Sequence, residues 1–216
     1  DEYRHAIVAR PDGMIAEVFF HPAFGTFETP LGAFEGIVDV AAFFTDDDRY
    51  RHLIVLQADG TLTEVFYHPD TGIFRAALGM YAGTRAIAGF YSPDDDYRHV
   101  LLAGIDGSVS ELFYHPRNGQ GIAPLGSFAD VSDIAGFYSS DDRLRHAIVL
   151  AADSVIEIYF GPQVGQGQTV VAKVEGARRV AAFYSQADPF FARRVLVADI
   201  QGRQHEVRYS PKNGIV

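Results

Sequence analysis

The chain contains no cysteine and no tryptophan among its 216 residues. Without cysteine it forms no disulfide, offers no thiolate to a metal and has no cysteine nucleophile. No apolar run approaches the roughly 18 residues of a membrane-spanning helix. A net charge of −10 excludes a nucleic-acid phosphate backbone as a partner. What remains, with 48% hydrophobic and 21% charged residues, is the composition of a folded globular protein.

An internal repeat organises the whole chain and therefore decides the fold class. An Arg-His pair recurs every 47 residues, and an Arg-Arg pair continues the series after 48: Arg4-His5, Arg51-His52, Arg98-His99, Arg145-His146 and Arg193-Arg194. A turn and then a glutamate follow each pair: Glu17, Glu64, Glu111, Glu157 and Glu206. Three repeats continue with a His-Pro pair: His21-Pro22, His68-Pro69 and His115-Pro116. An aromatic run and then an acidic loop complete the unit. The aromatic runs lie at Phe43-Phe44, Phe90-Tyr91, Phe137-Tyr138 and Phe183-Tyr184.

Each repeat predicts a β meander. Asp59-Gly60 lies between two apolar, β-branched runs, which is a strong hairpin signal. No segment shows a sustained 3.6-residue period, so we expect no long helix. Four short strands at this period are typical of a propeller. The sequence therefore predicts an all-β, five-bladed β-propeller in one domain, 1–216, with repeats at about 1–47, 48–94, 95–141, 142–188 and a partial one at 189–216.

In blade count and repeat length the chain resembles the tachylectin-2 type of five-bladed lectin. The resemblance implies a propeller architecture and is limited to it. The tryptophan-rich motifs of that lectin have no counterpart in a chain without tryptophan, so the resemblance implies no binding residue.

The Ala-Ala-Phe and Ala-Gly-Phe runs predict the innermost strand of each blade, because small side chains fit where blades converge. We expect their phenylalanines to be core residues: Phe43, Phe90, Phe137 and Phe183. Only four such runs exist for five repeats, so we expect the first blade to lack its inner strand. That strand would come from another chain, in a homo-oligomer, or from another segment.

A two-residue Asp-Gly turn would place Arg51 opposite His68, and the first and third repeats would follow the same register. We therefore expect a rim of polar groups, with these candidate ligand-binding residues: Arg4, His21, Arg51, His68, Arg98, His115, Tyr91 and Tyr138. For the repeated histidines and glutamates outside this set we expect a structural role. In that interpretation, His52 and its counterparts bond to a backbone carbonyl or an Asp, and each Glu pairs with an Arg of its own or the adjacent blade.

The sequence predicts no catalytic residue, cofactor or metal site, because it carries no phosphate loop, nucleophile elbow or zinc motif, and its acidic loops lack a calcium pattern. Near-identical repeats favour a multivalent binding module, most simply a carbohydrate-binding, lectin-like propeller. A protein-interaction scaffold and, third, a hydrolase acting in the axial funnel are the alternatives, so the expected partner is a glycan or a protein surface. A cysteine-free chain fits secretion and the cytoplasm equally, and Asp1 in place of an initiator methionine suggests processing or excision from a longer chain.

Overall fold

The computed structural model describes residues 4–68, 70–161, 164–185, 193–210 and 214–215, and within them it is all-β, without helices. The strands form five antiparallel sheets of the propeller-blade type, as the sequence predicts. The chain divides into an N-terminal unit, residues 1–82, and a C-terminal unit, residues 83–216. No helix in the described part of the chain is long and apolar enough to cross a membrane.

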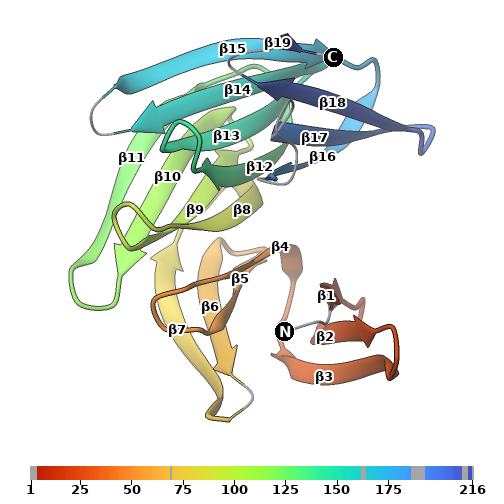
Figure 1. Cartoon of the computed structure of the whole chain (residues 1–216), viewed down its shortest axis with the longest axis vertical. Coiled ribbons are helices and arrows are strands. Elements are labelled where there is room, and N and C mark those ends of the chain that lie inside the picture. Colours follow the sequence, from red (N-terminus) through yellow and green to blue (C-terminus); the bar gives the residue numbers. More distant parts are fainter. Residues whose placement is uncertain (1–3, 69, 162–163, 186–192, 211–213, 216) are drawn as a thin grey trace. The chain divides into compact units, whose positions relative to one another are not determined.

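Blades 1 and 2 form the N-terminal unit (Figure 1). Blade 1 has three described strands: β1 (Arg4–Ala9), β2 (Met14–His21) and β3 (Gly25–Ala33). Blade 2 has four: β4 (Ile37–Phe44), β5 (Arg51–Gln57), β6 (Thr61–His68) and β7 (Gly72–Met80). The prediction that blade 1 lacks its inner strand is therefore confirmed for the described residues. Pro69, of the second His-Pro pair, lies outside them.

Blades 3, 4 and 5 form the C-terminal unit and have four strands each. Blade 3 consists of β8 (Thr84–Ser92), β9 (Tyr97–Gly104), β10 (Ser108–His115) and β11 (Gly119–Ser127). Blade 4 consists of β12 (Val131–Ser139), β13 (Leu144–Ala151), β14 (Ser154–Gly161) and β15 (Gly165–Lys173). Blade 5 consists of β16 (Ala177–Tyr184), β17 (Arg193–Asp199), β18 (Gln204–Ser210) and β19 (Gly214–Ile215).

The inner strands carry Ala or Gly because neighbouring blades meet there. A Cβ atom added to Gly136 of β12 would lie 2.6 Å from Leu101 and 3.0 Å from the ring of Phe90, both in blade 3. Phe90 and Phe137 are accordingly 5% and 6% exposed, as predicted. The core prediction is wrong for Phe183, which is 41% exposed, and for Phe43, which is half-buried. Both lie in the last blade of their unit, so no following blade of that unit covers the ring.

The predicted cross-strand register is wrong by one residue. Arg51 pairs with Tyr67, and the corresponding Arg4 and Arg98 pair with an aromatic residue rather than with His21 and His115. The hairpin loop has three residues and ends at Gly60, whose φ is 89° and whose N–H donates to the carbonyl of Gln57 over 2.9 Å. A shift of one residue moves every side chain of a strand to the other face.

Candidate functional site

The corrected register places the second residue of each Arg-His pair beside the repeated glutamate. The Nδ1 and Oε1 atoms lie 2.7–2.9 Å apart in four blades: His5 with Glu17, His52 with Glu64, His99 with Glu111 and His146 with Glu157. The last three histidines are buried, and each stacks on the phenylalanine of its inner strand at 4.9–5.2 Å. This burial and bonding fit the structural role expected for these histidines, although the partner of Nδ1 is the repeated glutamate rather than a backbone carbonyl or an Asp.

The two buried imidazoles of the C-terminal unit each lie between two carboxylates. The Nε2 atom of His146 lies 3.4 Å from Asp142 of the acidic loop, and that of His99 lies 3.3 Å from Asp95. Both ring nitrogens must donate to satisfy two carboxylates, which requires the imidazolium form. Burial alone would lower the pKa of His146, but the hydrogen bonds to Asp142 and Glu157 outweigh it and raise the pKa. The pKa of His99 is raised in the same way. Burial alone would lower it, but the hydrogen bonds to Asp95 and Glu111 outweigh that effect.

An arginine of the next blade closes a ring of four charges around each of these histidines. Arg193 of β17 contacts Asp142 and lies 3.7 Å from Glu157. Arg145 of β13 lies 3.1 Å from Asp95 and 3.7 Å from Glu111. The order His, Glu, Arg, Asp alternates positive and negative charge, so each member is bonded to two opposite charges. We call this arrangement the charge ring; it joins blade 3 to blade 4 and blade 4 to blade 5.

A pocket of about 340 Å³ adjoins the charge ring between blades 4 and 5. Glu157 and Tyr159 of β14 and Thr169 of β15 line one side, and Arg193 and Tyr209 line the other. The hydroxyl of Tyr209 donates to Glu157 over 2.7 Å. Burial, and then the neighbouring Glu157 carboxylate, raise the pKa of Tyr209. The pocket thus combines a carboxylate, a guanidinium and phenol rings.

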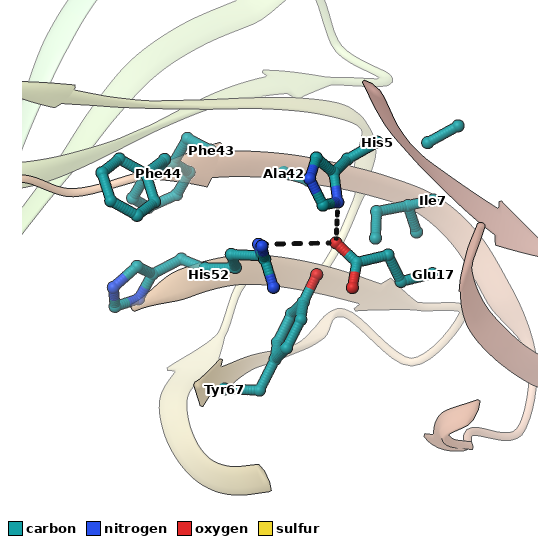
Figure 2. Close-up of a pocket in the computed structure, with 10 residues that line it drawn as sticks. His5, Ile7, Glu17, Ala42, Phe43, Phe44, His52 and Tyr67 are labelled. Atoms are coloured by element: carbon teal, nitrogen blue, oxygen red, sulfur yellow. Dashed lines mark hydrogen bonds and ion pairs between the residues drawn. The ribbon is translucent and has the colours of Figure 1, made fainter. Parts of the chain in front are cut away.

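The N-terminal unit repeats this arrangement between blades 1 and 2, where the pocket measures about 430 Å³ (Figure 2). Glu17 of β2 lies 2.8 Å from His5 and 3.7 Å from Arg51. Arg51 lies over the ring of Tyr67, 5.9 Å from its centre. Burial and the Glu17 carboxylate raise the pKa of Tyr67, which hydrogen-bonds to it. Carboxylate, guanidinium and tyrosine therefore meet between neighbouring blades in both units.

A third, smaller pocket of about 190 Å³ lies at the loop end of blades 3 and 4. Asp94, Asp95 and Asp142 line it together with Arg143 and Arg145. Burial would raise the pKa of Asp142, but the hydrogen bond from His146 and the charge of Arg193 lower it to about 2. The described residues contain no group of three or more carboxylates and histidines that could hold a metal ion.

The structure separates the arginines and histidines that the sequence paired as ligand residues. Arg51 lines a pocket, Arg98 is buried and Arg4 is exposed on β1. The histidines of the His-Pro pairs instead accept a backbone N–H two residues later through Nδ1, at 3.0–3.2 Å: His21 from Ala23, His68 from Asp70 and His115 from Arg117. They close the loop between the middle and outer strands.

The two candidate tyrosines bond to the acidic loops. Tyr91 donates to Asp96 over 2.8 Å. Tyr138 bonds to Asp94 of the preceding blade, and burial together with this bond raises its pKa to about 12. Neither lines one of the three pockets. Both tyrosines therefore hold loop and strand together.

Sequence reasoning missed most of the residues that line these pockets. The residues not named as ligand candidates include Glu17, Tyr67, Arg145, Glu157, Arg193 and Tyr209. Each belongs to a repeated series, so the signal was present. If the hairpin loop is counted as three residues instead of two, the register places Tyr67, rather than His68, opposite Arg51.

Sequence comparison finds no matching protein family and no matching curated protein. Solved structures do match the fold. The crystal structure of AofleA from Arthrobotrys oligospora is 12% identical, with a TM-score of 0.74 over 100% of this chain and 68% of that one. The fungal lectin from Aleuria aurantia, described as a six-bladed β-propeller with a novel fucose recognition mode, is 11% identical, with a TM-score of 0.76 over 98% and 72%. SapL1 lectin in complex with alpha methyl fucoside is 17% identical, with a TM-score of 0.73 over 100% and 74%.

At these identities the likeness shows the fold, and the propeller prediction is confirmed. The neighbouring structures are larger than this chain, which corresponds to 68–74% of their length.

Proposed function

We propose that this chain is a carbohydrate-binding, lectin-like protein that holds sugar units between neighbouring blades. The observation that carries the proposal is the recurrence of one pocket in both units. A glutamate of one blade meets an arginine and a tyrosine of the next, as Glu157 meets Arg193 and Tyr209. A carboxylate accepts hydrogen bonds from sugar hydroxyls, and a guanidinium donates to them. The role proposed is binding rather than catalysis.

The pocket between blades 4 and 5 has the surfaces that a sugar ring needs. Tyr159 is 36% exposed at its mouth and offers an aromatic face for C–H groups. Val171 supplies an apolar wall, and Thr169 adds a hydroxyl. Repeated weak sites on one molecule gain affinity for a multivalent glycan.

Fucosides are the first ligands to test, because two solved structures of this fold are described by fucose binding. Titration calorimetry with methyl α-L-fucoside, alongside a glycan array, measures both affinity and the number of sites. Tyr159→Ala should remove one site and leave the melting temperature within a few degrees, because the ring is exposed. Phe24→Ala is the control: this ring is 67% exposed and lies away from the three pockets. Unchanged stoichiometry in Tyr159→Ala would contradict this site.

A protein-interaction scaffold is the second candidate, favoured by apolar side chains on the outer strands of the N-terminal unit. Phe27 of β3 is 43% exposed, and Ile73 and Phe74 of β7 are 43% and 44% exposed. Exposed apolar surface of this kind is typical of docking sites. A glycan array without binding at millimolar sugar would favour the scaffold over the lectin.

A further inference from the structure

His146 of β13 is a fully buried histidine whose two ring nitrogens both face carboxylates of the proposed sugar pocket. Its Nδ1 atom lies 2.9 Å from Oε1 of Glu157, and its Nε2 atom lies 3.4 Å from Oδ1 of Asp142. Both carboxylates line the 340 Å³ pocket between blades 4 and 5, whereas the imidazole lies behind them. The histidine therefore contacts the pocket through these two carboxylates.

One guanidinium holds the same two carboxylates from the other side. Arg193 of β17 contacts Asp142 and lies 3.7 Å from Glu157. It also lies 3.3 Å from Asp141 of the acidic loop. With His146 protonated, two cations thus alternate with the two carboxylates that line the pocket.

Phenols are the remaining titratable groups around the imidazole. Tyr209 of β18 donates to Glu157 over 2.7 Å, Tyr159 of β14 pairs across the strands with His146, and Tyr184 of β16 bonds to the acidic loop. Strand β12 stacks a phenylalanine on the imidazole at 4.9 Å. Strand β15 presents a glycine and a threonine opposite these residues of β14, and neither titrates. Proton loss near pH 7 therefore falls on the histidine.

Loss of this proton disturbs a carboxylate of the pocket whichever nitrogen gives it up. A neutral imidazole keeps one N–H, so it donates to one carboxylate and turns a lone pair toward the other. If Nδ1 keeps its proton, the lone pair faces Asp142; if Nε2 keeps it, the lone pair faces Glu157. In both cases the ring is left with an uncompensated buried negative charge, which is costly.

We propose that the proton on His146 controls sugar binding by the pocket between blades 4 and 5. With the imidazolium in place, Asp142 and Glu157 hold the positions described above. Without it, one of them leaves its position and the affinity for sugar falls. This regulation rests on the proposed function and concerns the same pocket.

The direction of the pH dependence follows from the surroundings of the imidazole. Burial would lower the pKa of His146, but its hydrogen bonds to Asp142 and Glu157 raise it above the ordinary value of 6.5. The protonated form therefore prevails at pH 6.5 and below, and it is lost as the pH rises through the folded pKa. Sugar binding should decline on that alkaline side.

The first test measures the affinity for methyl α-L-fucoside by NMR from about pH 5 to 9, read at the amide of Thr169, which lines the pocket. The imidazole signal of His146 is followed in the same samples, and melting temperatures show that the chain stays folded. Affinity should be constant below the His146 titration. Above it, affinity should fall about tenfold per pH unit, because only the protonated fraction binds.

A reciprocal measurement needs no variant. If the proton favours sugar binding, bound sugar must favour the proton to the same extent. Saturating fucoside should therefore raise the pKa of the His146 imidazole. A histidine with a purely structural role would titrate at the same pH with and without sugar.

A variant shifts the proton without removing the histidine. In Asp142→Asn the amide can bond to a neutral imidazole as well as to a charged one. The decline in affinity should therefore move to lower pH by at least about one unit. Asp46→Asn makes the same change on an exposed loop of the N-terminal unit and should leave the decline in place.

The chain without sugar separates this proposal from the proposed function. The N–H of Leu144 donates to Oδ1 of Asp142 over 3.0 Å, so displacement of Asp142 should speed its exchange, corrected for the intrinsic effect of pH. Displacement of Glu157 should instead change the ring carbon signals of Tyr209. Either change, occurring with the His146 titration, supports the coupling. If it occurs although fucoside binds at no pH, only the proposed function is contradicted.

Three results would overturn the regulation itself. The first is that both reporters stay unchanged while His146 loses its proton. The second is equal fucoside affinity on the two sides of that titration. The third is a decline that occurs at the same pH in Asp142→Asn and in the unchanged chain.

Discussion

Tyr209 of β18 donates a hydrogen bond of 2.7 Å to Glu157 of β14, and the two residues belong to neighbouring blades. Glu157 is 3% exposed and also bonds to His146, so the phenol is one of several donors that keep a buried carboxylate satisfied. The same carboxylate lines the proposed sugar pocket. Stability of the blade contact and geometry of the binding site therefore depend on one network.

Removing only this hydroxyl should measurably weaken the contact between blades 4 and 5. Tyr209→Phe should lower the free energy of unfolding by about 1–3 kcal/mol, because a buried acceptor loses a donor while the ring stays in place. Urea denaturation provides the measurement. Tyr159→Phe, which changes an exposed phenol, is the control and should stay within about 0.5 kcal/mol. Equal losses in the two variants would contradict the role of the bond.

Two phenylalanines of the same repeat position should differ sharply in their contribution to stability. Phe90→Ala should cost about 3–5 kcal/mol, because the ring is buried between blades 3 and 4. Phe183→Ala should cost less than about 1.5 kcal/mol, because 41% of that residue is already exposed. Denaturant midpoints of the two variants compare them directly. A Phe183→Ala loss as large as that of Phe90→Ala would show that blade 5 is covered in solution.

The charge ring predicts a stability maximum in mildly acidic solution. The raised pKa of His146 contributes stability that is complete below about pH 6.5, its unfolded value, and is lost as the pH rises through the folded pKa. The lowered pKa of Asp142 contributes stability that is present above 3.8 and is lost as the pH falls through about 2. Unfolding free energies should therefore be highest between about pH 4 and 6.5.

A variant isolates this effect from the other titrating groups. Asp142→Asn should lower the pKa of the His146 imidazole, followed by NMR, and should flatten the decline of stability above pH 7. Asp46→Asn, on an exposed acidic loop, should change neither. A His146 imidazole that titrates at 6.5 or below in the unchanged protein would mean that it is not held as a cation.

The histidines of the His-Pro pairs should contribute to the stability of their loops and not to sugar binding. His115→Ala should cost about 1 kcal/mol, because the N–H of Arg117 loses its acceptor. His115→Asn should restore much of that loss, since a short amide oxygen makes the same kind of turn. Fucoside titrations of all three proteins should coincide. A loss of one sugar site in His115→Ala would return this residue to the ligand-binding set.

The sequence predicts the blades well because each turn and strand signal is local. The 47-residue period, the turn glycines such as Gly60 and the small inner-strand residues such as Gly136 all correspond to features of the structure. The candidate site was less predictable because an Asp-Gly pair suits hairpin loops of two or three residues. That one-residue choice decides whether Arg51 faces Tyr67 or His68.

The exposure of the inner phenylalanines could not be deduced from the repeat alone. Phe137 and Phe183 occupy the same position, yet only Phe137 has a following blade packed against it in its unit. A repeat pattern describes one blade at a time, whereas burial depends on what covers that blade.

The charge ring also bears on how such a protein can lengthen by duplication. Each ring contains two cations and two anions, such as His146 and Arg193 against Glu157 and Asp142, and so has no net charge. Copying a repeat therefore adds another contact of this kind without accumulating buried charge from blade to blade. With His99 and His146 counted as cations, the formal net charge of −10 becomes −8, and this negative surplus lies outside the rings, where mutation can alter it without breaking the contacts between blades.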